Sequence, residues 1–153
     1  MNGQEPRSRA GARVVSGDEI NPGRLRELTP DQCRQLLRRE RVGRVAVVTP
    51  AGWPLIRPVD YVFDERSGSV VFRSRRGSKL HALSHSDRAS FEIDSGADTS
   101  TTWSVIVTGV VETITRAPEI ERLERLGLGT RVTVQPDTWL RIRPNVISGR
   151  RGD

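Results

Sequence analysis

One stretch of the chain decides how it can fold: Phe72-Arg73-Ser74-Arg75-Arg76-Gly77-Ser78-Lys79-Leu80. The apolar residues 70–72 predict a strand, Gly77 permits a turn, and residues 78–83 predict the first turns of a helix. A strand that passes through glycine into a helix directs free backbone N–H groups and the positive end of the helix dipole at one point. Arginines, serines and the only lysine in the chain surround that point. The stretch therefore predicts a phosphate or carboxylate site, and the alternative is a solvated basic turn.

Length and composition set the outer limits. The 153 residues suffice for one domain with a hydrophobic core and are too few for two. A formal charge of +6 favours nucleic acid or an anionic small molecule as the partner. Aromatic residues make up only 5% of the chain, whereas nucleic-acid surfaces usually interleave aromatic and basic side chains. Nucleic acid is therefore the less favoured partner.

The sequence also predicts where the protein works. It contains a single cysteine, Cys33, so no internal disulfide can form. No apolar segment reaches the length of a membrane-spanning helix, and the N-terminus has no apolar core like that of a secretory signal. We therefore expect a cytoplasmic protein that does not bind membranes.

The chain divides into a tail and a domain. Residues 1–27 are mostly polar, glycine and proline, and we expect them to form a disordered polar tail, with the folded domain over residues 28–150. Thr29, Pro30 and Gln32 form the signature of a capping box, which predicts that a helix begins here. Cys33 lies on the apolar stripe of that helix, so it is expected to be a small core residue and not a nucleophile.

The remaining pattern is dominated by strands. Alternating or continuous apolar runs predict strands over residues 42–49, 53–63, 69–74, 89–94, 103–115 and 139–143, the last one stopped by Pro144. Residues 105–111 are apolar on both faces, which predicts cover on both sides, as in a barrel or at a subunit interface. A helix is expected over residues 118–126, with Ile120, Leu123 and Leu126 facing inward. The order favours a mainly β protein, an antiparallel barrel with peripheral helices.

One strand breaks the usual rules. Pro54 and Pro58 cannot donate ladder hydrogen bonds, which restricts the strand to an edge or a bulge. Arg57 shares a face with apolar residues, so it needs either an anionic ligand or a core carboxylate such as Asp60 or Glu92. Elsewhere, His81 and His85 have a spacing that could hold a metal, but no third ligand is nearby and we predict no metal site.

Four stretches together resemble one known family. They are residues 42–46, residues 52–61, residues 72–80, and residues 103–109. In order and spacing they are similar to the pyridoxamine 5′-phosphate oxidase-like family, the FMN-binding split barrels, over roughly residues 29–150. The resemblance implies a six-stranded antiparallel split β-barrel. It also implies a homodimer that binds flavin at the subunit interface, with one site on each side.

The resemblance also implies the cofactor-binding residues. Residues 57–61 would lie along the flavin ring and ribityl chain, and Ser74, Ser78 and Lys79 would bind the phosphate. Arg73 or Arg75 would assist, and Ser104 would lie near the ring. The full implied set comprises Arg57, Pro58, Val59, Asp60, Tyr61, Arg73, Ser74, Arg75, Gly77, Ser78, Lys79, Trp103 and Ser104.

The chain also departs from the family pattern. The oxidase itself carries a C-terminal Arg-x-His arrangement, and here no histidine follows His85, so oxidation of vitamin B6 is not expected. We expect an FMN-binding oxidoreductase with an unidentified small-molecule substrate and no assignable catalytic residue. Three alternatives stay open: a reductase using the deazaflavin coenzyme, whose acidic tail Arg75, Arg76 and Arg150 could hold; a flavin- or haem-binding protein without turnover; and a basic nucleic-acid-binding barrel.

Overall fold

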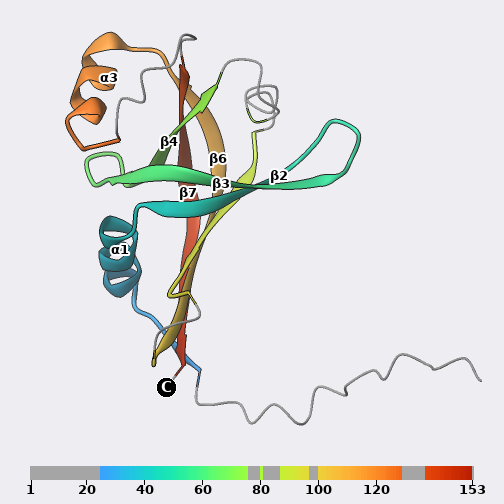
Figure 1. Cartoon of the computed structure of the whole chain (residues 1–153), viewed down its shortest axis with the longest axis vertical. Helices are drawn as coiled ribbons and strands as arrows, with labels where there is room; N and C mark the ends of the chain where they lie inside the picture. The colour runs from blue at the N-terminus through green and yellow to red at the C-terminus, as the bar shows by residue number, and fades with distance from the viewer. Residues whose placement is uncertain (1–24, 76–79, 81–86, 97–99, 129–136, 153) are drawn as a thin grey trace, which may run out of the picture.

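The structure, a computed structural model, describes residues 25–75, 80, 87–96, 100–128 and 137–152, and it is mainly β (Figure 1). The elements in chain order are β1 (Arg26–Glu27), α1 (Pro30–Arg39), β2 (Val42–Val48), β3 (Pro54–Asp64), β4 (Ser69–Arg75), β5 (Ala89–Asp94), β6 (Thr102–Ile114), α3 (Ala117–Glu124) and β7 (Asp137–Gly152). The antiparallel strands follow the order β7-β4-β3-β2-β5-β6, and β6 pairs with β7 to close the barrel. The predicted six-stranded split barrel is confirmed, with β1 added outside it.

Helix α1 begins as the sequence predicts. The Thr29 hydroxyl accepts a hydrogen bond from the Gln32 N–H at 3.3 Å, and the Gln32 side chain accepts one from the Thr29 N–H at 2.9 Å. This reciprocal capping box satisfies two N–H groups that have no partner inside the helix. Cys33 and Leu37 are buried against the barrel, which confirms that Cys33 is a core residue.

The apolar residues form two cores. The first fills the barrel interior, with Phe72 and Phe91 among its largest side chains. The second lies between α3 and the outer face of the sheet, where Leu123 packs with Trp139. The prediction that Leu126 faces inward is wrong: α3 ends at Glu124, and Leu126 lies in the following turn and is exposed.

Strand β7 is longer than the sequence suggests. Pro144 does not stop it: the strand continues to Gly152, and Pro144 lies at a β-bulge where the register with β6 shifts between Thr108 and Gly109. The bulge tolerates a proline because the ladder is already interrupted there. A side chain on Gly109 would clash with the Arg143 carbonyl, so the glycine permits the close approach. The C-terminal end of β7 pairs with β1. The sheet therefore includes residues 26 and 27, which the sequence analysis assigned to the disordered tail.

The middle of β6 is covered on one face only. Val105 and Val107 are buried in the barrel, but Ile106 between them is 43% exposed on the outer face. One chain by itself therefore does not provide the two-sided cover that the sequence predicts.

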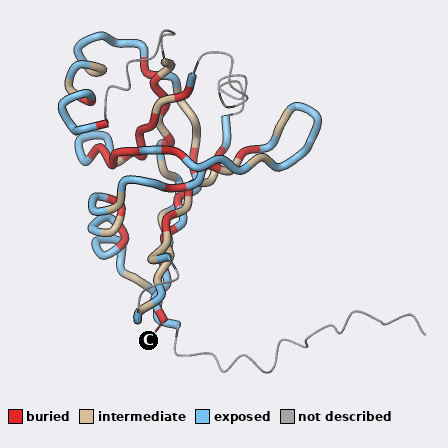
Figure 2. Tube along the Cα trace, in the orientation of Figure 1, coloured by how far each residue is buried: buried red, intermediate tan, exposed pale blue. Residues whose placement is uncertain are grey.

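The barrel opens between β3 and β4. Residues 54–60 of β3 pair with β2, and β4 joins only at residues 61–64. Beyond Phe72, β4 still pairs with β7 but no longer with β3. The β2–β3 hairpin therefore projects from the barrel body, and its tip is exposed (Figures 1 and 2).

The position of the prolines follows from this opening. The Tyr61 N–H donates to the Arg41 carbonyl at 2.9 Å, so in the alternating antiparallel ladder the backbone groups of Pro54, Ile56 and Pro58 face away from β2. Both prolines thus occupy positions on an open edge that need no donor, and the edge-strand prediction is confirmed.

Candidate functional site

A cavity of about 630 Å³ lies where β3 and β4 separate. The described residues that line it are Arg41, Arg57, Pro58, Val59, Asp60, Tyr61, Arg73, Ser74, Arg75, Leu80, Gly127, Leu128 and Asp137. The structure therefore brings together two segments that the sequence analysis singled out, residues 57–61 and residues 73–75. The split in the barrel creates the space between them.

Arg57 lies on the β3 wall of the cavity. Its side chain is exposed and donates from Nη1 to the Ile56 carbonyl at 3.0 Å. Glu92, one of its two suggested carboxylate partners, instead pairs with Arg44 at 3.2 Å. Arg57 shares its face of β3 with the buried Val59 and Tyr61, as expected, but it is itself exposed because this part of β3 extends past β4.

Tyr61 forms part of the cavity wall and is held firmly. Its hydroxyl donates to the Leu37 carbonyl at 2.8 Å, and its ring meets Phe91 edge-on with centroids 4.7 Å apart. Burial, with a smaller contribution from the nearby Glu40 carboxylate, raises the pKa of the Tyr61 phenol. The side chain is therefore a neutral, fixed structural element of the wall.

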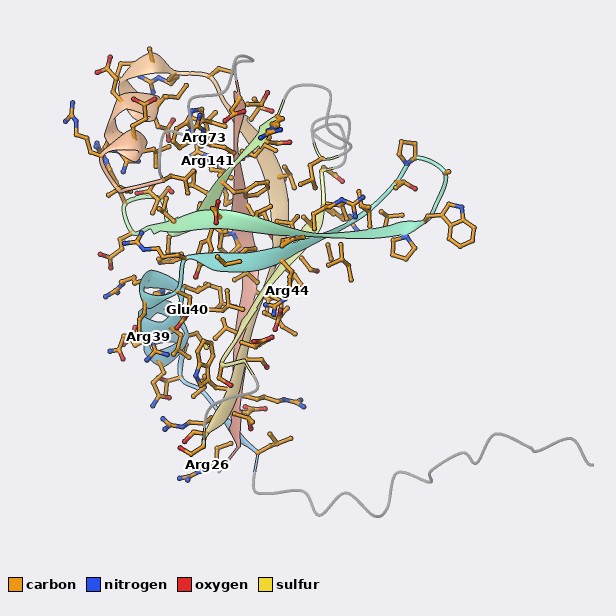
Figure 3. All side chains as sticks on the ribbon, viewed as in Figure 1. Arg26, Arg39, Glu40, Arg44, Arg73 and Arg141 are labelled. Carbon is orange, nitrogen blue, oxygen red and sulfur yellow. The ribbon has the colours of Figure 1, made fainter. Side chains whose placement is uncertain are left out.

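The β4 wall holds two arginines in different environments. Arg73 is labelled in Figure 3. Its guanidinium pairs with Asp137 at 2.7 Å and lies 5.4 Å from the centroid of the Trp139 ring. The Arg73 and Asp137 side chains are only 18% and 10% exposed. Arg75 is exposed at the cavity rim, and Ser74 between them is buried. Arg73 is thus engaged within the fold, while Arg75 is the accessible cation of this segment.

Trp103 and Ser104 do not line this cavity. Trp103 lies in a separate cavity beside α1, where the Arg39 guanidinium is 5.5 Å from its ring centroid. Ser104 lies opposite Asp94 and Arg150 in the sheet, on the same outer face as Ile106 two residues later. Within one chain, Trp103 and Ser104 therefore do not lie beside residues 57–61.

Several other expectations lie outside the described residues. These are the phosphate-site residues Gly77, Ser78 and Lys79, and the histidines His81 and His85. Within the described part of the chain, no three His, Cys, Asp or Glu side chains come together in a way that could hold a metal ion. None of the described helices combines the length and the apolarity needed to cross a bilayer.

Five lining residues are absent from the set predicted from the sequence: Arg41, Leu80, Gly127, Leu128 and Asp137. Arg41 follows α1 and donates from Nη1 to the Leu126 carbonyl at 3.5 Å, while Asp137 opens β7 directly across from Arg75. Only the register of β4 with β7 identifies Asp137 as a neighbour, and no local sequence signal encodes that register.

The cavity combines cations with backbone acceptors. The side chains of Arg41, Arg57 and Arg75 are exposed around the cavity. The open β3 edge presents the Pro58 carbonyl as an acceptor, and Pro58 has no backbone N–H that could donate. Such an arrangement binds a ligand with an anionic end and a body rich in hydrogen-bond donors.

Cys33 offers no nucleophile, because burial raises the pKa of its thiol.

Comparisons with known proteins agree with this architecture. The chain is 34% identical over 131 residues, 82% of this chain and 84% of the relative, to the uncharacterized protein Rv0080 of Mycobacterium tuberculosis (strain ATCC 25618 / H37Rv). A solved FAD-binding protein from Mycobacterium smegmatis is 28% identical, with a TM-score of 0.72 over 83% of this chain and 98% of that one. A solved FAD-binding protein from Mesorhizobium loti is 23% identical, with a TM-score of 0.71 over 84% and 97%, and shares the fold.

The family assignment rests on a match along most of the chain. The sequence profile described as pyridoxamine 5′-phosphate oxidase matches residues 29–151, a range that includes the described barrel strands, apart from the last residue of β7, and both segments of the cavity. The chain therefore belongs to the pyridoxamine 5′-phosphate oxidase family.

Proposed function

We propose that the cavity between β3 and β4 binds a phosphorylated flavin, FMN, and that the protein is a flavin-dependent oxidoreductase acting on a small molecule. The observation that carries the proposal is the junction of an open strand edge with exposed arginines in one cavity of about 630 Å³. Flavin binding by the similar protein from Mycobacterium smegmatis supports it.

The β3 edge suits the body of the ligand. The backbone groups of Ile56 and Pro58 face away from β2, and Pro58 contributes a carbonyl but no N–H. An edge with more acceptors than donors favours ligand groups that donate, and the ribityl hydroxyls and the ring N–H of a flavin are such groups. Arg57 lies between these two residues in the strand, and its side chain can reach over the same edge.

The β4 wall suits the phosphate. Arg75 is accessible at the rim and Ser74 lies beside it, and we propose that both bind the phosphate with Gly77, Ser78 and Lys79, which follow directly in the sequence. Arg73 has a different role: its pair with Asp137 fixes the end of β4 against β7 and so positions its neighbours.

We also propose a homodimer. The outer face of the barrel exposes Ile56 at 61%, Val146 at 58% and Ile106 at 43%, so a second copy packed there would bury apolar surface. Ser104 is on this same face of β6 as Ile106. A subunit interface here would account for a cofactor-binding role of Ser104 that one chain alone does not explain.

Bound FMN supplies the hydride-transfer chemistry. The residues of this chain bind the phosphate, orient the ring along β3 and set the electrostatic surroundings. Among the described lining residues, Tyr61 donates to the Leu37 carbonyl and Asp137 pairs with Arg73. Asp60 is an exposed carboxylate of the wall, and we assign it no catalytic role.

The test is calorimetric titration of the purified protein with FMN and with riboflavin, which lacks the phosphate. We expect FMN to bind more tightly, and Arg75→Gln to weaken FMN binding about tenfold while leaving riboflavin unchanged. Arg34→Gln, an exposed arginine on α1 outside the cavity, is the matched control. Equal affinity for the two flavins, or FMN binding that Arg75→Gln leaves intact, would contradict the proposal.

A second candidate is the deazaflavin coenzyme. Three exposed arginines, Arg41, Arg57 and Arg75, line the cavity from separate parts of the chain. A cofactor with a longer acidic tail could place its several acidic groups against these separate arginines. The absorption spectrum and released mass of any chromophore that copurifies from the native host distinguish the two, because a deazaflavin absorbs at shorter wavelength than FMN.

A further inference from the structure

A second cavity, of about 490 Å³, lies between α1 and the ends of β6 and β7 and shares no described lining residue with the cavity between β3 and β4. Its lining combines an aromatic ring, aliphatic side chains, amides and two arginines, among them Leu28, Gln32, Leu36, Arg39, Trp103 and Arg151. None of the described lining residues is acidic.

The apolar part of this cavity is a preformed wall. Leu28, Leu36 and Trp103 are partly buried and pack against the barrel core. Their packing fixes the orientation of the indole, so one part of the ring is supported by the core while another faces the cavity. A rigid aromatic wall of this kind suits the flat body of a ligand and orders few side chains when the ligand binds.

The two arginines converge on this wall from different elements. Arg39 reaches it from the last turn of α1 (Figure 3). Its guanidinium lies over the Trp103 ring, 5.5 Å from the centroid. Arg151 is directly opposite Trp103 in the β6–β7 register. Among the described residues, Arg39 pairs with Glu40 at 3.0 Å, and the two side chains are 64% and 34% exposed. Surface ion pairs of this kind contribute little to stability. Both guanidinium groups can therefore bind an anion at the cavity.

We propose that this cavity binds a flat aromatic anion, a ring system bearing a carboxylate or phosphate. The ring contacts Trp103, Leu28 and Leu36, and the anionic group binds between Arg39 and Arg151. Because the Arg39 guanidinium lies over the indole, its N–H groups can donate to the anionic group of a ligand whose ring contacts the indole beside it. The site stands apart from the proposed flavin site and does not depend on it.

The experiment titrates the full-length ¹⁵N-labelled protein with 2-naphthoate and follows the indole N–H signals of its three tryptophans. The variants Trp53→Phe and Trp139→Phe assign the signals and leave Trp103 intact. We expect a saturable shift of the Trp103 signal, with the signals of Trp53 and Trp139 unchanged. The uncharged analogue 2-naphthamide should bind about tenfold more weakly, as expected for loss of a charge-assisted hydrogen bond.

Three variants complete the test. Arg39→Gln and Arg151→Gln should each weaken 2-naphthoate binding about tenfold, whereas Arg34→Gln on the same helix should not. A shift of Trp139 in place of Trp103, or equal binding of naphthoate and naphthamide, would overturn the proposal. The absence of any Trp103 shift would also overturn it, since the cavity would then be closed to ligands in the protein as it exists.

Discussion

Arg122 and Asp64 form a bidentate ion pair, with Nη1 to Oδ1 at 2.7 Å and Nη2 to Oδ2 at 2.8 Å. The pair joins α3 to the end of β3, and the Asp64 carboxylate also accepts a hydrogen bond from the Ser67 hydroxyl at 2.6 Å. The Asp64 side chain is only 2% exposed. The carboxylate is thus compensated inside the protein, and α3 is fixed over the second core.

The first prediction concerns acid stability. The hydrogen bonds from Arg122, outweighing the opposing effect of burial, lower the pKa of Asp64 to about 2. Since a lowered folded-state pKa contributes stability above the unfolded-state pKa, this contribution of about 2 kcal/mol should be lost as the pH falls from about 4 to about 2. Denaturant unfolding at several pH values measures it. In Asp64→Asn the loss over this window should be absent, while the exposed Asp31→Asn should behave like the unaltered protein.

The second prediction concerns Gly43 in β2. A Cβ there would overlap the ring of Phe91 and lie 2.9 Å from the Glu92 carbonyl oxygen, so Gly43→Ala should destabilise the barrel by about 1–3 kcal/mol. Thermal unfolding gives the value. The double variant with Phe91→Leu should lose less than the sum of the two single changes, because the smaller side chain leaves room for the methyl group. Strict additivity would show that the overlap is not the cause.

The elements of this fold were largely predictable, because their signals are local. The capping box at Thr29 and the alternation of apolar and polar residues in β5 are each encoded by residues close together in the sequence, and both are found in the structure. Pro58 was read correctly as an edge residue, since a missing donor restricts a strand wherever it lies. Two residues of the arginine-rich stretch, Ser74 and Arg75, line a cavity, and the anion site itself stays a prediction.

What the sequence did not reveal depends on register between distant strands. Pro144 suggested a strand end, and only the bulge opposite Gly109 shows that β7 continues. Asp137 neutralises Arg73 because β7 pairs with β4, so one arginine of that stretch is engaged while its neighbour is accessible. Trp103 and Ser104 are adjacent in sequence but face opposite sides of β6, and so they lie in different surroundings.

The third prediction tests the open edge of β3. Because Pro58 faces away from β2, Pro58→Ala removes no ladder hydrogen bond and adds an N–H that water can satisfy. The free energy of unfolding should fall by no more than about 1 kcal/mol, the usual effect of a more flexible unfolded chain. Chemical denaturation measures this value. A loss several times larger would mean that this edge is covered in the protein.

The last prediction separates the two arginines of β4. Arg73→Gln leaves the largely buried Asp137 carboxylate without its cation, so the loss should lie at the lower end of the about 3–5 kcal/mol that breaking a buried pair costs. Arg75→Gln, at the exposed rim, should change the free energy of unfolding by less than about 0.5 kcal/mol. Denaturant unfolding of both variants makes the comparison. Adding Asp137→Asn to Arg73→Gln should recover part of the loss, since it removes the uncompensated charge. If Asp137→Asn instead deepens the loss, the pair does not act as a unit, and the division of roles between Arg73 and Arg75 would be wrong.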